Sequence, residues 1–200
     1  MSSEPQPQVS ESRAFLVVIL GTVVLGFAAY GVSFILGVPL EEALHPSLRD
    51  FAVGIIATIP LAGFLWWFSN TTLEHFAAFR RSQIKFFAEI GFEFTPSRIA
   101  LMAVAAGISE ELFFRGVLQT WIGGFAPAVV AIVLSNVVFG MLHMRTALYA
   151  IIAGLVGVYL GVLYAVVDNL IAPMAAHALY DALALEYTRR AVINHRSGEI

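Results

Sequence analysis

The sequence contains no cysteine and few charged residues, with Asp, Glu, Lys and Arg making up 12% of its 200 positions. Without cysteine the chain can form no disulfide, offer no thiol nucleophile and build no cysteine-ligated zinc or iron–sulfur centre. Its 11 basic and 14 acidic residues give a net charge of −3. This balance supplies no basic surface for nucleic acid, which we do not expect as a partner. Any chemistry must come from carboxylates, histidines, hydroxyls or arginine.

Apolar residues fill most of the chain. They make up 59% of the sequence, and the mean hydropathy is +0.83. Soluble domains contain about 45–50% apolar and about 25% charged residues, so this chain is predicted to lie in a lipid bilayer. A span needs about 20 apolar residues, which leaves room for about six helices and no second folded domain. The predicted fold class is all-α, a polytopic transmembrane helix bundle of about six spans.

The distribution of polar residues predicts five regions. We expect a disordered tail over 1–13, two N-terminal spans over 14–68, a cytoplasmic loop over 69–98, a four-helix core over 99–187 and a cytoplasmic tail over 188–200. The core spans should cover about 99–123, 127–143, 147–167 and 170–187, and their short connectors make them antiparallel neighbours. Gly154, Gly157 and Gly161 form a small-residue seam that lets another helix approach closely.

The predicted loop over 69–98 is unusual in mixing phenylalanines with Arg80, Arg81 and Lys85. Basic residues interleaved with aromatic ones favour a helix that lies in the headgroup layer of the membrane. A plain cytoplasmic loop is the alternative.

The basic residues also predict the orientation. With six spans and both termini cytoplasmic, one side holds only Arg49, and the cytoplasmic side holds Arg13, Arg80, Arg81, Lys85, Arg98, Arg145, Arg189, Arg190 and Arg196. Cytoplasmic loops of membrane proteins carry such an excess of Lys and Arg, and an odd number of spans would destroy the asymmetry. We therefore expect a multi-pass protein of the cell's inner (plasma) membrane.

Ionisable residues interrupt the apolar core spans. They are Glu110, Glu111 and Arg115 in the third span, His143 at the end of the fourth, and His177 and Asp181 in the sixth. A charged side chain at the bilayer centre costs about 2.5–3.5 kcal/mol even on the most lenient insertion scale. These groups are thus expected to face one another or a water-filled cavity.

Helical spacing separates the two adjacent glutamates. Glu111 and Arg115 are four residues apart, which places them on one face and favours an intrahelical ion pair. Glu110 lies about 100° around the same helix, so the arginine cannot engage both carboxylates equally. Glu110 is predicted to project toward another helix as the free carboxylate.

The same spacing groups residues of two other spans. His177 and Asp181 share a face, as do Phe139 and His143, with Asn136 two turns before His143 on that side. Three helices can thus present polar groups to one centre. We interpret Glu111, Arg115, Phe139 and Asn136 as supporting residues of that centre.

A carboxylate next to an imidazole is a general-base pair that can take a proton from water and later return it to a leaving amine. A second imidazole can donate a hydrogen bond to the oxygen on which negative charge develops. Metal binding is the competing chemistry, in which Glu110, His143 and His177 would ligate zinc or manganese. The HExxH arrangement is absent from the sequence, so local spacing does not require a metal, and we expect no cofactor.

Two alternatives assign the cluster no hydrolytic role. The charged groups could serve helix packing alone, in a non-enzymatic membrane protein such as an immunity factor or scaffold. They could also relay protons in a small transporter. No inverted repeat relating the first three spans to the last three is visible, which counts against the transporter.

Three segments, EELFFR (110–115), FGMLH (139–143) and HALYD (177–181), resemble in order the EExxxR, FxxxH and HxxxN/D motifs of the CPBP (Abi) intramembrane endopeptidases. This family includes the type II CAAX prenyl proteases and bacterial relatives linked to bacteriocin processing or self-immunity. The resemblance covers roughly Ile99 to Leu185, about the second half of the chain. The two N-terminal spans and the phenylalanine-rich loop carry no identifiable resemblance.

The resemblance implies that Glu110 activates water together with His143, and that His177 and residue 181 support the oxyanion. The prenyl proteases have asparagine where this chain has Asp181. Because an ionised aspartate only accepts hydrogen bonds, Asp181 must either be protonated or orient His177. We favour metal-free glutamate catalysis in a cavity that opens to the cytoplasm.

The resulting hypothesis is an intramembrane endopeptidase that cleaves a membrane-anchored peptide or protein. Its substrate would be lipidated or would carry a C-terminal sorting segment. A non-enzymatic immunity or scaffold protein of the same family is the alternative.

Overall fold

The computed structural model describes residues 11–89 and 93–197, and every regular element in these ranges is helical. Residues 1–10 of the predicted tail over 1–13 lie outside the described residues, as do 90–92 of the predicted loop and 198–200 of the second tail.

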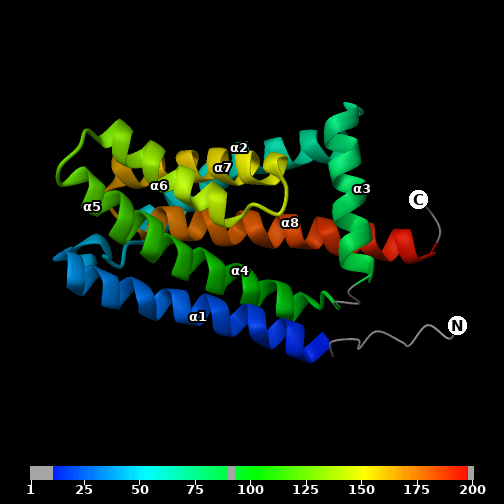
Figure 1. The fold of residues 1–200 in the computed structure, drawn as a ribbon, viewed down its shortest axis with the longest axis horizontal. Helices are drawn as coiled ribbons and strands as arrows, with labels where there is room; N and C mark the ends of the chain where they lie inside the picture. The colour runs from blue at the N-terminus through cyan, green and yellow to red at the C-terminus, as the bar shows by residue number, and fades with distance from the viewer. Residues whose placement is uncertain (1–10, 90–92, 198–200) are drawn as a thin grey trace, which may run out of the picture.

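Eight α-helices are described, with a short 3-10 helix (η1) and a π-helix (η2) between them: α1 Glu11–Leu36, η1 Leu40–Ala43, α2 Leu48–Asn70, α3 Glu74–Glu89, α4 Pro96–Glu111, η2 Leu112–Gln119, α5 Thr120–Gly123, α6 Ala128–Leu142, α7 Ala147–Val167 and α8 Ile171–Ser197. Figure 1 shows α1, α2, α4, α6, α7 and α8 running along the long axis, with α3 lying across one end. The predicted helical bundle is confirmed.

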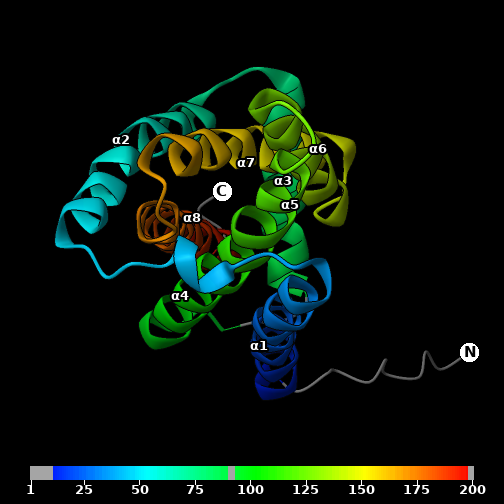
Figure 2. The same ribbon diagram turned by 90° about the vertical axis from the view of Figure 1, so that its left-hand side faces the viewer.

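Helix α8 forms the centre of the bundle. Viewed from the end opposite α3, it is surrounded by α2, α7 and α4 (Figure 2). Glycines permit these close approaches: a side chain at Gly54 would run into the Ala172 carbonyl of α8, and one at Gly107 would lie 2.8 Å from the backbone nitrogen of Ala178. The backbones of α4 and α8 therefore lie close together, which brings the site residues of the two helices near one another.

Three described segments are long and apolar enough to cross a membrane: Arg13–Leu36, Leu48–Asn70 and Ala147–Val167. Helix α6, Ala128–Leu142, is a shorter apolar helix. The chain is an integral membrane protein, and the count of six spans stays a prediction. In Figure 1, α1 begins and α8 ends at the same end of the bundle, as an even number of crossings requires.

Hydroxyl side chains fix the starts of three helices. Ser47, Thr95 and Thr146 each accept a hydrogen bond from the backbone N–H three residues later, which satisfies one of the free donors at the N-terminus of α2, α4 and α7. Helix α7 ends where Asp168 adopts a left-handed conformation with a φ of 55°.

Helix α8 is longer than the span predicted over 170–187 and continues through most of the predicted tail over 188–200. Glu186 forms ion pairs with Arg189 at 2.6 Å and with Arg190 at 2.7 Å. Pairs three and four residues apart support an exposed helical turn, so the helix continues after the apolar run ends.

The segment predicted as a loop or an interfacial helix contains α3. Arg80 of this helix donates to the Phe68 carbonyl at 2.6 Å and to the Thr71 carbonyl at 2.9 Å. These carbonyls lie at the C-terminus of α2, where backbone acceptors have no partner within the helix. Arg80 thereby fixes α3 across the end of the bundle.

Candidate active site

A cavity of about 590 Å³ lies between the helices at the end of the bundle that α3 crosses. Side chains of α1, α2, α3, α4, α7, α8 and the α6–α7 connection line it. Glu110, His143 and Asp181 form part of its wall, and His177 lies beside them with a 7% exposed side chain. The groups predicted from three separate segments are thus brought together.

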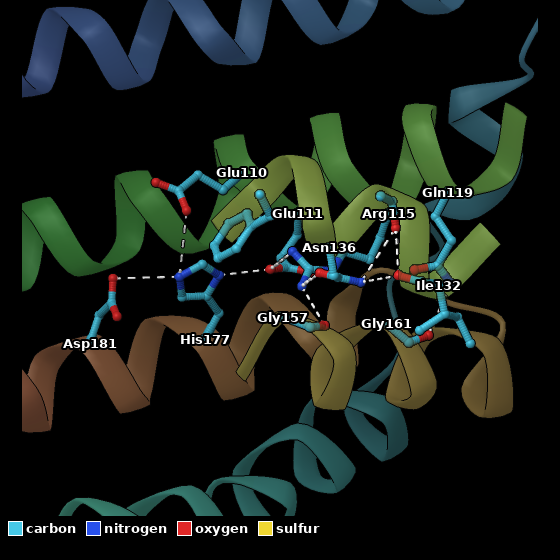
Figure 3. A network of polar contacts seen from close by, with 12 residues as sticks. Glu110, Glu111, Arg115, Gln119, Ile132, Asn136, Gly157, Gly161, His177 and Asp181 are labelled. Atoms are coloured by element: carbon cyan, nitrogen blue, oxygen red, sulfur yellow. Dashed lines mark hydrogen bonds and ion pairs between the residues drawn. The ribbon is translucent and has the colours of Figure 1, made fainter. Parts of the chain in front are cut away.

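Glu110, in the last turn of α4, faces both histidines. Its Oε2 lies 3.9 Å from Nε2 of His143 and 3.8 Å from Nε2 of His177. The Glu110 side chain is 17% exposed, on the cavity side. Figure 3 shows it turned away from the Glu111–Arg115 network and toward His177. This carboxylate can reach a molecule in the cavity.

Two carboxylates and one arginine orient His177. Its Nδ1 lies 2.7 Å from Oε1 of Glu111, which also accepts a hydrogen bond from Nη1 of Arg115 at 2.9 Å. Because an ionised carboxylate only accepts hydrogen bonds, Nδ1 of His177 must carry a proton. Nε2 faces Glu110, and Oδ2 of Asp181 lies 3.5 Å from it (Figure 3).

His143 stands at the C-cap of α6, directly after Leu142. Its Nδ1 lies 2.8 Å from the carbonyl oxygen of Phe139, and the two rings are 4.3 Å apart. The carbonyl can only accept, so Nδ1 of His143 donates to it, and Nε2 faces Glu110. Phe139 therefore sets the orientation and the tautomer of His143.

Arg115 is completely buried and holds the inner part of the site together. It pairs with Glu111, donates from Nη2 to Oδ1 of Asn136 at 3.0 Å and to the carbonyl of Gly157 at 2.7 Å, and lies 5.1 Å from the centre of the Phe139 ring. The predicted Glu111–Arg115 pair is confirmed. A buried charge is tolerated when it is paired and hydrogen-bonded in this way.

Helix α7 supplies main-chain acceptors to this network. Besides Gly157, its Gly161 carbonyl accepts from Nε2 of Gln119 at 3.0 Å. A side chain at Gly157 would collide with Asn136, and one at Gly161 would lie 2.7 Å from Oε1 of Gln119. The predicted glycine seam is confirmed, but its role as a hydrogen-bond acceptor was not predicted, because carbonyls leave no signature in a sequence.

The helix that carries EELFFR changes geometry within the motif. Residues 112–119 form a π-helix, although the sequence predicts one continuous α-helix over 99–123. π-helical turns bond each residue to the fifth along the chain and occur often at functional sites. Sequence reasoning also missed Tyr149, whose ring centre lies 6.0 Å from that of His143 at the cavity wall, since a single tyrosine in an apolar helix gives no signal.

The metal alternative needs ligands arranged around one point. Within the described residues, no group of three or more His, Asp or Glu side chains has that arrangement. Glu110 Oε2 lies 3.8–3.9 Å from the two Nε2 atoms, whereas neighbouring donors of a tetrahedral zinc ion are about 3.4 Å apart. Glu110, His143 and His177 as arranged here do not form a closed ligand set.

Fold and site together define a helical integral membrane protein with a carboxylate–imidazole cluster at the wall of a cavity. Residues 92–183 match the family model described as type II CAAX prenyl endopeptidase Rce1-like. The match contains all three motifs and confirms the resemblance inferred from them. The segment over 92–183, a little under half of the chain, is therefore similar to this family of CAAX-protease-like endopeptidases.

A relative from Bacillus subtilis (strain 168), named uncharacterized protein YpbD, is 32% identical over 100 residues. The aligned region covers 46% of this chain and 49% of YpbD, so the chain matches about half the length of this relative. No solved structure matches the chain.

Proposed function

We propose that the chain is an intramembrane endopeptidase in which Glu110 and His143 activate a water molecule against a peptide bond. The observation that carries this proposal is the position of the Glu110 carboxylate, with Oε2 within 3.9 Å of two imidazole Nε2 atoms at the cavity wall. The similarity of residues 92–183 to the type II CAAX prenyl endopeptidase Rce1-like model supports a peptidase activity.

In the proposed reaction, Glu110 takes a proton from a water molecule in the cavity while the water oxygen attacks the carbonyl carbon of the scissile bond. The C–O bond forms and the carbonyl oxygen becomes negative. When the tetrahedral intermediate collapses, the C–N bond breaks and Glu110 returns the proton to the leaving amine. General acid–base catalysis of this kind contributes about 10²–10⁴-fold in rate.

His143 orients the attacking water. Its Nδ1 donates to the Phe139 carbonyl, so its Nε2 can accept a hydrogen bond from the same water that Glu110 deprotonates. Two acceptors 3.9 Å apart can hold one water molecule between them, with its oxygen lone pair free for attack.

His177 stabilises the oxyanion as an imidazolium. Glu111 holds the proton on Nδ1, and a second proton on Nε2 provides the donor for the developing negative charge. Asp181, 3.5 Å from that nitrogen, acts as the counter-charge that keeps the ring in place. An aspartate can thereby replace the asparagine of the prenyl proteases without itself donating to the oxyanion.

The proposed substrate is a membrane-anchored peptide or protein that is lipidated or carries a C-terminal sorting segment. Much of the cavity wall is apolar and aromatic, including Phe64, Phe68, Phe79, Phe86 and Phe87. Such a wall suits an apolar peptide or a lipid-linked one. The proposed location is the inner (plasma) membrane, and the proposed catalysis is metal-free.

The test compares purified wild type with Glu110→Gln, His143→Ala and, as a control, Glu41→Gln, which alters an exposed carboxylate of η1. Each protein is incubated with fluorescent membrane-anchored peptides, with and without EDTA. We expect Glu110→Gln and His143→Ala to lose at least about 10²-fold in rate at an unchanged melting temperature, and Glu41→Gln to stay active.

Two outcomes would contradict the proposal. If the Glu110→Gln variant folds and keeps the biological function of the wild type, the chain is a scaffold or immunity protein. If EDTA abolishes cleavage, the metal-free mechanism is wrong.

A further inference from the structure

Helix α3 turns one face toward the cavity. Residues 79, 80, 83, 84, 86 and 87 line the cavity wall. On the other face, Arg81 pairs with Glu74 at 2.6 Å and Lys85 with Glu89 at 3.8 Å, and these four side chains are largely exposed. The inward face therefore belongs to the cavity and the outward face to the surroundings.

Two polar side chains, Arg80 and Gln83, lie on the inward face, and of these two Arg80 alone donates hydrogen bonds to described residues. Arg80 bonds the carbonyls at the end of α2. Gln83 Nε2 is buried and has no hydrogen-bond partner among the described residues. A buried donor left without a partner costs about 1–3 kcal/mol, so a ligand that supplied an acceptor here would gain affinity.

Aromatic contacts connect this face to the reacting groups. Phe79 stacks on Tyr149 with ring centres 6.1 Å apart, and Tyr149 meets His143 edge-on at 6.0 Å. Gln83 lies one helical turn beyond Phe79 on the same face. An extended peptide advances about 3.3 Å per residue, so Gln83 is within about six residues of a bond cleaved beside His143.

We propose that Gln83 is a substrate-positioning residue whose side-chain amide donates a hydrogen bond to a main-chain carbonyl of the bound peptide. An extended peptide presents one such carbonyl at every residue, so the contact does not depend on the side chains of the substrate. The inference rests on the proposed peptidase function, because it assigns the cavity to a peptide.

The experiment replaces Gln83 in two ways. Gln83→Glu keeps the shape but removes the N–H donors, and Gln83→Met keeps the length without any polar atom. The matched control is Lys85→Met, two residues away on the exposed face. The probe is an S-farnesylated fluorescent peptide ending in a Cys-aliphatic-aliphatic-X sequence, presented in detergent micelles.

We expect both Gln83 variants to raise KM for the probe about fivefold to tenfold, the loss that follows from one net hydrogen bond, with kcat within twofold of wild type. Lys85→Met should leave both constants unchanged. The melting temperature of Gln83→Met should be equal to or higher than that of wild type, because the variant removes an unpartnered donor. A purely structural role would instead lower it.

A second arm locates the acceptor. Each peptide carbonyl of the probe is replaced in turn by a methylene group, and KM is measured with wild type and Gln83→Met. One position should raise KM with wild type but not with Gln83→Met, which is the coupling expected of two groups in contact. If all replacements act equally on both proteins, Gln83 bonds water or a lipid carbonyl and the inference is wrong.

Binding of the probe, measured by fluorescence anisotropy, separates this inference from the proposed function. If wild type binds the probe in a Gln83-dependent manner but never cleaves it, the peptidase proposal fails and Gln83 still positions the peptide. If wild type cleaves the probe and the Gln83 variants match it in KM, the inference fails alone. If the probe is neither bound nor cleaved, both fail.

Discussion

Glu110 and Glu111 are adjacent residues of one type with different surroundings. Glu110 is partly exposed to the cavity and lies nearly 4 Å from each histidine. Glu111 is fully buried between Arg115 and His177, at 2.9 and 2.7 Å. The first carboxylate can meet a substrate, whereas the second balances a buried charge and orients a ring.

This contrast predicts that the same substitution lowers the stability of the protein much more at Glu111 than at Glu110. Glu111→Gln leaves Arg115 buried without its counter-charge, and we expect it to lower the free energy of unfolding by about 3–5 kcal/mol. Glu110→Gln removes no close ion pair and should change stability by less than about 1 kcal/mol. Denaturant unfolding in detergent, followed by tryptophan fluorescence, measures both. Equal stabilities of the two variants would show that Arg115 does not depend on Glu111.

At this scale, spacing within a helix predicted the Glu111–Arg115 pair and the free position of Glu110, because both follow from the 100° turn per residue. It did not predict that Glu111 also bonds His177, or that Gln83 faces the cavity. Those contacts join residues far apart in the chain, 66 positions in the first case, and depend on how the helices pack.

Helices α6 and α7 form the back of the site, and their close approach depends on glycine. Arg115 reaches the Gly157 carbonyl because no side chain intervenes. Such small-residue seams let helix backbones approach closely in membranes.

Gly157→Ala should therefore disturb the site without changing any ionisable group. The added methyl would collide with Oδ1 of Asn136 and lie 3.2 Å from Nη2 of Arg115. We expect a loss of stability of about 1–3 kcal/mol, the usual cost of overpacking, together with reduced cleavage.

Gly63→Ala in α2 is the matched control, because the same methyl would meet nothing within 4 Å there. Melting temperature and cleavage rate are measured for both variants. A Gly157→Ala protein as stable and active as the Gly63→Ala protein would mean that the seam relaxes at no cost.

Apolar runs predicted where the helices lie, since lipid exposure selects them. They did not predict the π-helical turn over 112–119 or the length of α8. An apolar run is compatible with either an α-helical or a π-helical turn, so it does not distinguish the two over 112–119. The end of α8 is stabilised by the ion pairs of Glu186 rather than by contact with lipid.

At the scale of the whole molecule, the cavity can be reached from the cytoplasm only if the end of the bundle that carries it faces the cytoplasm. Helix α3 and the cavity lie at one end of the long axis, and η1 lies at the other (Figure 1). The excess of basic residues predicts that the α3 end is cytoplasmic.

The cysteine-free chain makes this orientation measurable. Ser82→Cys on α3 and Glu41→Cys on η1 each introduce one exposed thiol. In intact cells, a membrane-impermeant maleimide should label Glu41→Cys and not Ser82→Cys, and inverted membrane vesicles should reverse the result. Labelling of both from one side would exclude the six-span topology.

Composition alone predicted an all-helical membrane protein, because so apolar a chain cannot fold in water. The central place of α8 could not be predicted, since its mixture of apolar and charged residues resembles neither a lipid-facing span nor a soluble helix. Only the packing of α2, α4 and α7 around it explains that pattern.

Helix α7 contacts Arg115 and Gln119 through peptide carbonyls. No substitution can remove these oxygens or alter their chemistry; mutation can only push them away by adding bulk. Substitutions that change the chemistry of the site must therefore be made on α4, α6 and α8. Substitutions on α7 can change only the distance between its carbonyls and the side chains of Arg115 and Gln119.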